Sequence, residues 1–347
     1  MQKTMKAIVK ARPETGGLEL REVPVPEIGA SDVLVKMRKV GICGTDMHIY
    51  KWDAWAQRVI QTPMIIGHEY VGEIAAMGSA VKGLEIGQLV SGEGHLVCHT
   101  CRWCVSGQQH LCRQTKGVGV NRDGVFAEYA AIPATNIVVC NPSVPESVLA
   151  IQDALGNAMH TAYQFPLIGE DVLITGMGPI GLMAIPVVKL AGARNIVVTA
   201  RREGPLKLAR ELGATRCVNV KNERISDVVK ELGMREGFDV GLEMSGNPEA
   251  FAEMVDNMAN GGKIAILGIF ADDVKLDWDK IIFRMLTLKG IYGREMYESW
   301  YKMQALLPHG LADEIAKCVT HEFYYTDFEK GFQAMGSGEA VKVVLTF

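Results

Sequence analysis

Four cysteines stand close together in one short segment, at Cys98, Cys101, Cys104 and Cys112. Four thiolates on a short loop can enclose a zinc ion as a closed tetrahedron, which leaves no position for a substrate. An iron–sulfur cluster is the main alternative, because thiolates also bind iron and the spacing resembles that of ferredoxins. A nucleic-acid-binding zinc ribbon is less favoured, because the chain carries a formal net charge of −4. The spacing therefore predicts a structural metal site.

A second set of metal-binding side chains comes from two other segments. Cys43 opens the sequence Cys-Gly-Thr-Asp-Met-His, and His68 and Glu69 follow a glycine. Cysteine, imidazole and carboxylate are the ligand types of catalytic zinc, whose three protein ligands leave a fourth position open. The alternatives are a buried, unreactive thiol and a hydrogen-bonded loop histidine. Asp153 could add a carboxylate at this site or could cap a helix.

A glycine-rich turn follows the apolar run at residues 171–175. Its G-x-G-x-x-G pattern is formed by Gly176, Met177, Gly178, Pro179, Ile180 and Gly181. The first glycine permits a tight turn, the second lets the backbone approach a pyrophosphate, and the third lets helix and strand pack closely. Between a strand and a helix, this pattern predicts dinucleotide binding rather than a plain turn.

The acidic residue that should follow about 20 residues later, to bind the adenosine ribose, is missing. The run at residues 195–199 is followed instead by Ala200, Arg201 and Arg202. Two guanidinium groups without a carboxylate suit a 2′-phosphate, so the local sequence favours NADP. The alternative is that both arginines belong to a solvated loop.

Two kinds of scaffold must position these residues. Apolar and polar residues alternate at 33–37, which predicts a strand with one buried face, and short apolar runs at 6–9 and 70–75 lie between glycine and proline turns. The first 150 residues therefore predict a β-rich barrel or sandwich.

From about residue 156 the pattern changes. Short apolar runs at 171–175, 195–199, 238–243 and 263–267 alternate with helix-compatible segments, which predicts βαβ units and a parallel sheet. The chain ends with a helical segment at 297–307 and an apolar strand at 341–347. We expect this late strand to complete an early sheet.

Composition narrows the class of protein. A chain of 347 residues suggests about two domains, and 48% hydrophobic with 22% charged residues is typical of a folded protein. The 36 basic and 40 acidic side chains give no global field for nucleic acid. The longest uncharged run, residues 172–188, is broken by glycine and proline, which argues against a membrane span. No signal-peptide pattern follows the first lysines, so we expect a cytoplasmic chain with reduced thiols.

Together, GICGTDMHIY, MIIGHEYVGE, the four-cysteine loop and GMGPIG resemble the zinc-containing medium-chain alcohol dehydrogenases over essentially the whole chain. The segments EGFDVGLEMSGNP and GIYGREMYESWYKM resemble, more narrowly, the members that oxidise L-threonine. The resemblance implies an α/β protein with a GroES-like β-rich catalytic domain at 1–155 and 296–347. Residues 156–295 would form a Rossmann domain with a doubly wound parallel sheet. It also implies a homotetramer.

For function, the resemblance implies oxidation of L-threonine to 2-amino-3-oxobutanoate, with hydride passed to a nicotinamide and two zinc ions per chain. Cys43, His68 and Glu69 would lie at the catalytic zinc, with Asp153 at a nearby acidic position. Thr45 and His48 would form the proton relay. The cofactor cleft would be lined by Ile180, Leu267, Gly268, Ile269, Ile291 and Tyr292.

Two points remain open within the resemblance. The family's usual acid is Ala200 here, and the basic residue expected shortly afterwards is Pro205, so the family's preference for NAD does not transfer directly. An amino-acid substrate also needs partners for its carboxylate and ammonium. Arg294 and either Glu93 or His95 are candidates, with plain surface roles as the alternative. The competing functions are a polyol or other secondary-alcohol dehydrogenase and a non-catalytic NADP-binding regulator.

Overall fold

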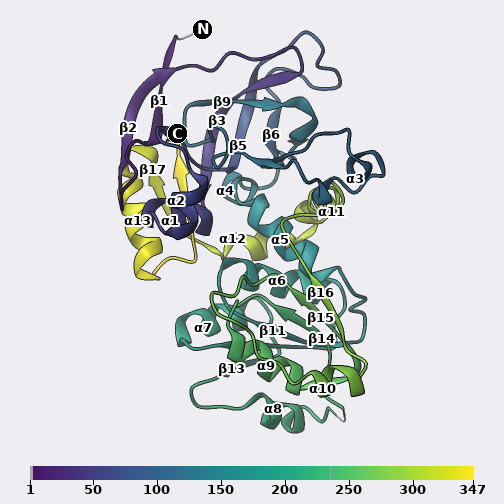
Figure 1. Cartoon of the computed structure of the whole chain (residues 1–347). Helices are drawn as coiled ribbons and strands as arrows, with labels where there is room; N and C mark the ends of the chain where they lie inside the picture. The colour runs from purple at the N-terminus through teal and green to yellow at the C-terminus, as the bar shows by residue number, and fades with distance from the viewer. Residues whose placement is uncertain (1–2, 235) are drawn as a thin grey trace. The chain divides into compact units, whose positions relative to one another are not determined.

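The computed structural model describes residues 3–234 and 236–347 and divides into two compact units (Figure 1). The first unit consists of Met1–Ala154 and Glu295–Phe347, and the second of Leu155–Arg294. The first unit therefore contains both ends of the chain.

The first unit is built mainly of antiparallel strands in three sheets. A three-stranded sheet has the order β2-β1-β4, and a two-stranded sheet pairs β7 with β8. The large sheet has the order β10-β6-β5-β3-β18-β17, and β9 also pairs with β3. The strands are β1 (Thr4–Lys10), β2 (Leu18–Pro24), β3 (Asp32–Ile42), β4 (Met64–Ile65), β5 (Glu69–Met77), β6 (Leu89–Gly92), β7 (His95–Leu96), β8 (Lys116–Gly117), β9 (Tyr129–Pro133), β10 (Ile137–Val139), β17 (Val319–Tyr324) and β18 (Lys342–Thr346).

The last strand of the chain does complete an early sheet. β18 lies antiparallel to β3, with Val343 opposite Ile42 and Leu345 opposite Val40. These four side chains are fully buried in one apolar core. The expectation from sequence is confirmed, because a run of buried β-branched residues needs a sheet interior to cover both of its faces.

The first unit also contains short helices. They are α1 (Gly44–Lys51), α2 (Ala54–Val59), α3 (Arg102–Val105), α4 (Glu146–Ala150), α11 (Glu298–Leu306), α12 (Leu311–Ala316) and α13 (Phe328–Ser337). Helix α5 (Gln152–Ala162) begins in the first unit and ends in the second. Phe332 of α13 is fully buried against the core that contains Ile42 and Val343. The helix therefore packs on the part of the large sheet that β18 and the edge strand β17 form.

The second unit contains one parallel sheet of six strands. In spatial order they are β13 (Arg216–Asn219), β12 (Asn195–Ala200), β11 (Asp171–Thr175), β14 (Phe238–Glu243), β15 (Met258–Ile266) and β16 (Thr287–Gly290). Numbered along the chain the order is 3-2-1-4-5-6, which is that of the Rossmann fold. Its helices are α6 (Pro179–Leu190), α7 (Glu203–Glu211), α8 (Ile225–Glu231), α9 (Pro248–Asp256) and α10 (Trp278–Phe283). The predicted α/β class with a doubly wound sheet is confirmed.

The order of the strands along the chain reverses between β11 and β14, which are parallel neighbours. The glycine-rich turn lies at this point. Every residue of β11 is buried, as an apolar strand in the middle of a covered sheet requires. Ligands of such sheets bind at the carboxyl ends of the strands, beside the reversal. Residue Gly176 follows β11 at that place.

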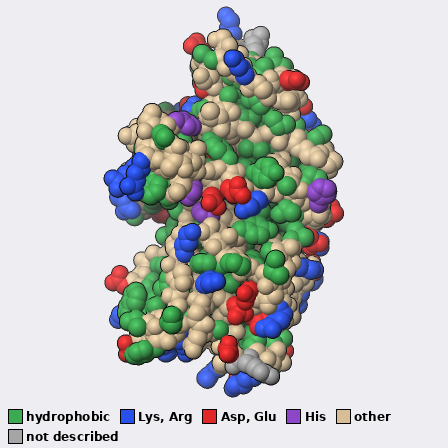
Figure 2. Space-filling view, turned by 90° about the vertical axis from the view of Figure 1, so that its right-hand side faces the viewer, with side chains coloured by type: hydrophobic (Ala, Val, Ile, Leu, Met, Phe, Trp, Pro, Cys, Tyr) green, Lys and Arg blue, Asp and Glu red, His purple; other side chains and the backbone are tan. Residues whose placement is uncertain are grey.

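The surface is mixed in character. Figure 2 shows acidic, basic and apolar side chains interspersed over the face that it presents. Within residues 3–234 and 236–347, no helix combines the length and the apolar character that crossing a bilayer demands.

Candidate active site

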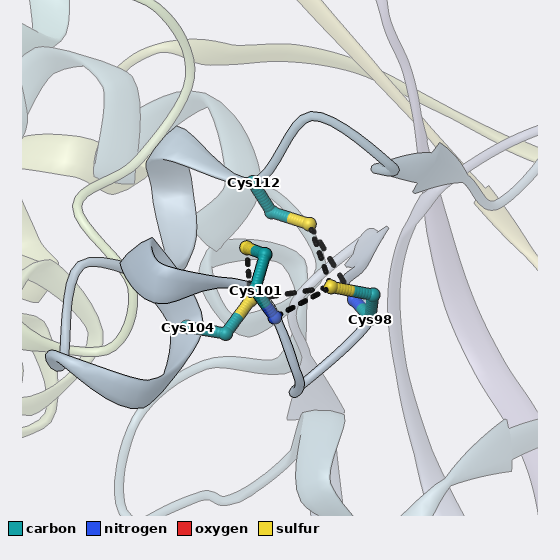
Figure 3. Close-up of side chains that lie close together, drawn as sticks. All are labelled: Cys98, Cys101, Cys104 and Cys112. Carbon is teal, nitrogen blue, oxygen red and sulfur yellow. Dashed lines mark hydrogen bonds between the residues drawn. The ribbon is translucent and has the colours of Figure 1, made fainter.

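The four cysteines of residues 98–112 converge on one point (Figure 3). Their sulfur atoms are separated by 3.9 Å between Cys98 and Cys104, 3.5 Å between Cys101 and Cys104, and 3.6 Å between Cys98 and Cys112. A tetrahedron with zinc–sulfur bonds of about 2.3 Å has sulfur–sulfur edges of about 3.8 Å. The cluster therefore has the dimensions of a shell around a single ion, whereas an iron–sulfur cluster would need room for its own iron and sulfide atoms.

Backbone amides hold these sulfur atoms in place. The N–H of Cys101 donates to Cys98 Sγ at 3.3 Å, and the N–H of Gln114 donates to Cys112 Sγ at 3.4 Å. Hydrogen bonds from the backbone of Thr100 and Cys101 lower the pKa of Cys98 to about 5. Burial raises the pKa of Cys104 to about 12. Such donors to ligand sulfur support metal binding in general.

The second set of potential ligands also comes together. One ligand atom each of Cys43, His68 and Glu69 lie within 4.8 Å of one another. Cys43 stands between the end of β3 and the start of α1, and Glu69 is the first residue of β5, directly opposite Gly41 of β3. The pairing of two adjacent strands thus brings together residues that are far apart in the sequence.

Two buried atoms of this set suit a metal ion. In the part of the chain that the structure describes, His68 Nδ1 and Glu69 Oε2 are buried and have no hydrogen-bond partner. Buried polar atoms are paired in nearly all proteins, so these exceptions need an explanation. An imidazole nitrogen and a carboxylate oxygen beside a cysteine sulfur are a suitable donor set for zinc.

The charges around His68 also favour a metal ion at this site. Burial by itself would lower the pKa of His68, but the negative charges of Cys43, Asp46 and Asp153 raise it to about 10. Burial also raises the pKa of Asp46 to about 6. The thiol and carboxylates around His68 therefore favour a cation, and a divalent ion would supply that positive charge.

A buried lysine from the last strand holds the other oxygen of Glu69. Lys342 Nζ of β18 lies 2.6 Å from Glu69 Oε1, and both side chains are buried. Burial would lower the pKa of Lys342, but Glu69 raises it above its ordinary value. Gly41 leaves the space that Glu69 Oε2 occupies, because a Cβ there would collide with it. Only one oxygen of Glu69 is thus left for a metal.

The two residues expected to form the proton relay, Thr45 and His48, lie on α1. Thr45 Oγ1 is 3.9 Å from Cys43 Sγ, and His48 is exposed one turn further along the helix. His48 Nδ1 lies 2.5 Å from Asp53 Oδ2, and Asp53 also caps α2 by accepting hydrogen bonds from two backbone N–H groups. Those backbone bonds, chiefly from Ala56, together with His48 hold the pKa of Asp53 below its ordinary value. The ring of His48 is therefore held at its Nδ1 atom.

Asp153 and the two candidate substrate residues of the first unit have different surroundings. Asp153 lies in the first turn of α5, buried, and a Cβ on Gly94 would contact both Asp153 Oδ1 and His68 Cβ at 3.5 Å. Glu93 is 1% exposed and accepts hydrogen bonds from His95 N–H and from the Trp300 indole, each at 2.8 Å. Glu93 thus anchors the surrounding chain, whereas His95 is partly exposed.

The three glycines of the turn meet the three requirements of a dinucleotide loop. Gly176 has a φ of +86°, in the left-handed region that favours glycine. Gly178 faces open space, because a Cβ there would meet no atom within 4 Å. A Cβ on Gly181 would collide with the carbonyl oxygen of Gly176, so only glycine allows α6 to pack so closely. Pro179 is the first residue of α6, whose N-terminal N–H groups suit an anion.

The other expected cofactor residues follow the carboxyl ends of the strands. Ala200 ends β12, and Arg201 and Arg202 are exposed before α7. Ile269 and Tyr292 are also exposed, whereas Arg294 is 4% exposed. The segments after β15 and β16 carry the members of this group that were expected near the nicotinamide, Leu267, Gly268, Ile269, Ile291 and Tyr292.

Sequence reasoning did not single out four polar residues. Asp46 accepts a hydrogen bond from Cys43 N–H at 2.8 Å, and the spacing C-x-x-D could have suggested this helix-capping contact. Glu243 could have been noticed as a carboxylate that ends an apolar strand. Asp53 and Lys342 carry no local signal for their contacts.

The comparisons with known proteins agree with this geometry. Residues 179–308 match the zinc-binding dehydrogenase family, and residues 29–143 match the alcohol dehydrogenase GroES-like domain. An L-threonine 3-dehydrogenase of Aeromonas salmonicida is 55% identical over 343 residues, which cover 99% of each chain.

Two solved structures share the whole fold. A zinc-binding dehydrogenase of Sinorhizobium meliloti, bound to NADP, is 28% identical with a TM-score of 0.89. An alcohol dehydrogenase of Escherichia coli CFT073, in complex with NADH, is 25% identical with a TM-score of 0.90. Each alignment covers 100% of both chains. The chain therefore belongs to the zinc-binding dehydrogenases.

Proposed function

We propose that this protein oxidises the secondary alcohol of L-threonine to give 2-amino-3-oxobutanoate, and passes the hydride to a nicotinamide dinucleotide. The open ligand set of Cys43, His68 and Glu69 carries the proposal, because it suits an ion that activates an alcohol. The substrate follows from a relative that is 55% identical over 99% of this chain and is an L-threonine 3-dehydrogenase.

The residues have separate roles in this reaction. Cys43, His68 and Glu69 would hold zinc, which when bound lowers the pKa of a coordinated hydroxyl. Thr45 would accept the hydroxyl proton first, and the exposed ring of His48 would exchange it with solvent. Asp153 would place a carboxylate beside His68. Loss of the proton at this site lets the carbon release its hydride.

The second unit would bind the dinucleotide. The N–H groups at the start of α6 and the open backbone at Gly178 would take the pyrophosphate. We propose a preference for NADP. Ala200 provides no carboxylate to repel the 2′-phosphate, and the next residue, Arg201, is exposed. The carboxylate of L-threonine would pair with Arg294, and His95 would contact its amino group.

Three further properties belong to the proposal. Cys98, Cys101, Cys104 and Cys112 would hold a second, structural zinc ion, which requires reduced thiols and so favours the cytoplasm. The edge of the second unit's sheet at β16 would join a second copy of the chain, as one interface of a homotetramer.

A kinetic matrix tests substrate and cofactor together. L-Threonine, sorbitol and 2,3-butanediol would each be assayed with NAD and with NADP, and we expect the highest kcat/KM for L-threonine with NADP. Faster turnover of sorbitol or butanediol would instead favour a polyol or secondary-alcohol dehydrogenase. One zinc ion per chain together with no turnover would favour a non-catalytic regulator.

A further inference from the structure

A buried carboxylate joins the loops at the point where the strand order in the second unit's sheet reverses. Glu243 ends β14 and is fully buried. Its Oε1 accepts hydrogen bonds from the N–H groups of Ser245 and Gly246, at 2.8 and 3.0 Å, and from the hydroxyl of Ser245. The hydroxyl of Thr175, the last residue of β11, lies 3.3 Å from the same oxygen. One side chain thus contacts the ends of two neighbouring strands.

The backbone of Glu243 holds a third loop. Its carbonyl oxygen accepts hydrogen bonds from the N–H groups of Leu267 and Gly268, which follow β15, at 2.9 and 3.1 Å. Gly268 packs directly on the carboxylate, because a Cβ there would collide with Glu243 Oε2. The end of β11 and the loops after β14 and β15 therefore share this one residue as a partner.

These three loops surround the place that the dinucleotide would occupy. Gly176 follows Thr175 directly, and a Cβ on Gly176 would approach the Ser245 Cα to 2.6 Å. The position of the glycine turn therefore depends on the position of Ser245, which Glu243 fixes. A displaced turn would no longer aim its N–H groups at the pyrophosphate.

We propose that Glu243 is a positioning residue for the dinucleotide, which sets the glycine turn, the Ser245–Gly246 loop and Leu267–Gly268 in their binding positions without contacting the cofactor. This inference rests on the proposed dinucleotide binding. A carboxylate suits the role because it only accepts hydrogen bonds, and all of its partners here donate.

The same unit offers a matched control at the other end of the sheet. Asp171 begins β11, is 1% exposed, and accepts hydrogen bonds from Arg194 Nε at 2.9 Å and Asn195 Nδ2 at 2.8 Å. It is a buried carboxylate in the same sheet, but at the amino ends of the strands. A general loss of stability would follow substitution at either position, whereas a loss of cofactor binding would follow only at Glu243.

The test compares Glu243→Gln with Asp171→Asn in the full chain. The amide of glutamine keeps the size of glutamate, but it removes the charge that strengthens the hydrogen bonds to Oε1. It also puts an NH2 group in place of Oε2, which accepts a hydrogen bond from the N–H of Gly246 at 3.3 Å. Dissociation constants for NADH and NADPH would be measured by fluorescence titration, with zinc content and unfolding by urea as further readouts. We expect Glu243→Gln to raise the dissociation constant of the preferred dinucleotide about tenfold or more. Asp171→Asn should leave it within about twofold, with wild-type zinc content in both variants.

Ser245→Ala keeps the inference testable should Glu243→Gln not fold. It removes one hydroxyl donor and leaves the carboxylate in place, and we expect an increase in the dissociation constant of about threefold. Unchanged affinity in the Glu243 variant, or in Ser245→Ala alone where Glu243→Gln does not fold, would overturn the inference, and so would an equal loss in Asp171→Asn. If the wild-type chain binds neither dinucleotide, the proposed function fails as well, so the two failures are distinguishable.

Discussion

At the scale of single residues, the proposed chemistry divides between buried and exposed groups. Glu69 is fixed by Lys342 at one oxygen, so the ligand set has little freedom to rearrange. His48 is the contrasting case, because its ring is exposed while its Nδ1 contacts Asp53. A group that must pass protons to water needs this exposure.

His48→Ala tests the relay. We expect turnover of L-threonine to fall about 100-fold, because the alanine cannot carry the proton, while zinc content stays at the wild-type value. The reaction would be followed by nicotinamide absorbance and the metal by elemental analysis. His309→Ala, an exposed histidine elsewhere in the first unit, is the control and should turn over normally. Parallel losses of zinc and activity in the His48 variant would show a structural role instead.

Ala200→Asp tests the choice of dinucleotide. A carboxylate at the end of β12 would repel a 2′-phosphate and accept hydrogen bonds from a ribose, so we expect the ratio of kcat/KM for NADP over NAD to fall at least about tenfold. Arg201→Ala should lower the same ratio by removing a positive charge. Arg224→Ala, which removes another exposed arginine of the second unit, should not change it. A wild-type preference for NAD would contradict the proposal outright.

At the scale of elements, local pattern and long-range contact contribute differently. The strand at Asp171–Thr175 and the helix at Pro179–Leu190 follow from the sequence, because a short apolar run, a glycine turn and a proline at the first helical position are all local signals. The approach of Glu69 to Lys342, or of Glu93 to Trp300, joins residues more than 200 positions apart. Periodicity says nothing about such pairs, since they depend on the order of strands in a sheet.

The candidate site shows the same limit. The ligand types at Cys43 and His68 could be recognised from the sequence, and the four-cysteine spacing was specific in itself. The residues that hold His48 and Glu69 could not be recognised from the sequence. Asp53, which holds His48, and Lys342, which holds Glu69, are ordinary charged residues until the fold places them.

A buried lysine connects two elements of the first unit and gives a prediction about pH. Lys10 of β1 is fully buried, donates hydrogen bonds to the carbonyl oxygens of Glu14 and Gly16, and lies 4.9 Å from the ring centre of Trp52. Burial lowers the pKa of Lys10 from 10.5 to about 8. The charged form therefore costs free energy in the folded state but not in the unfolded chain.

That cost should disappear as the pH rises. Between about pH 8 and 10.5 the unfolded chain binds the proton of Lys10 more tightly than the folded protein, so this residue makes the free energy of unfolding increase with pH. Urea unfolding of the wild type and Lys10→Met should diverge over this range in favour of the wild type. Lys6→Met, at an exposed position of the same strand, is the control and should run parallel to the wild type. A constant difference between wild type and Lys10→Met would contradict the assignment.

At the scale of the whole molecule, the second unit carries an apolar region on its surface. Trp278, Ile282, Phe283 and Met285, on and just after α10, are all more than 60% exposed. They precede β16, which is an edge strand of the six-stranded sheet. An open edge beside exposed apolar side chains is a place where chains associate. Two copies related by a two-fold axis could pair this edge with itself, and both copies would then cover the same residues.

Charged side chains on this surface should therefore break the assembly without unfolding the chain. We expect Phe283→Lys combined with Met285→Lys to convert the proposed tetramer to a smaller species in sedimentation velocity, because two exposed apolar side chains would become repelling charges at a shared face. The circular dichroism of the variant should match the wild type, since exposed positions contribute little to the folded state. Ile168→Lys, at another exposed apolar position of the same unit, is the matched control and should sediment like the wild type. A double variant that sediments like the wild type, or a wild type that sediments as a monomer, would show that this edge does not join copies of the chain.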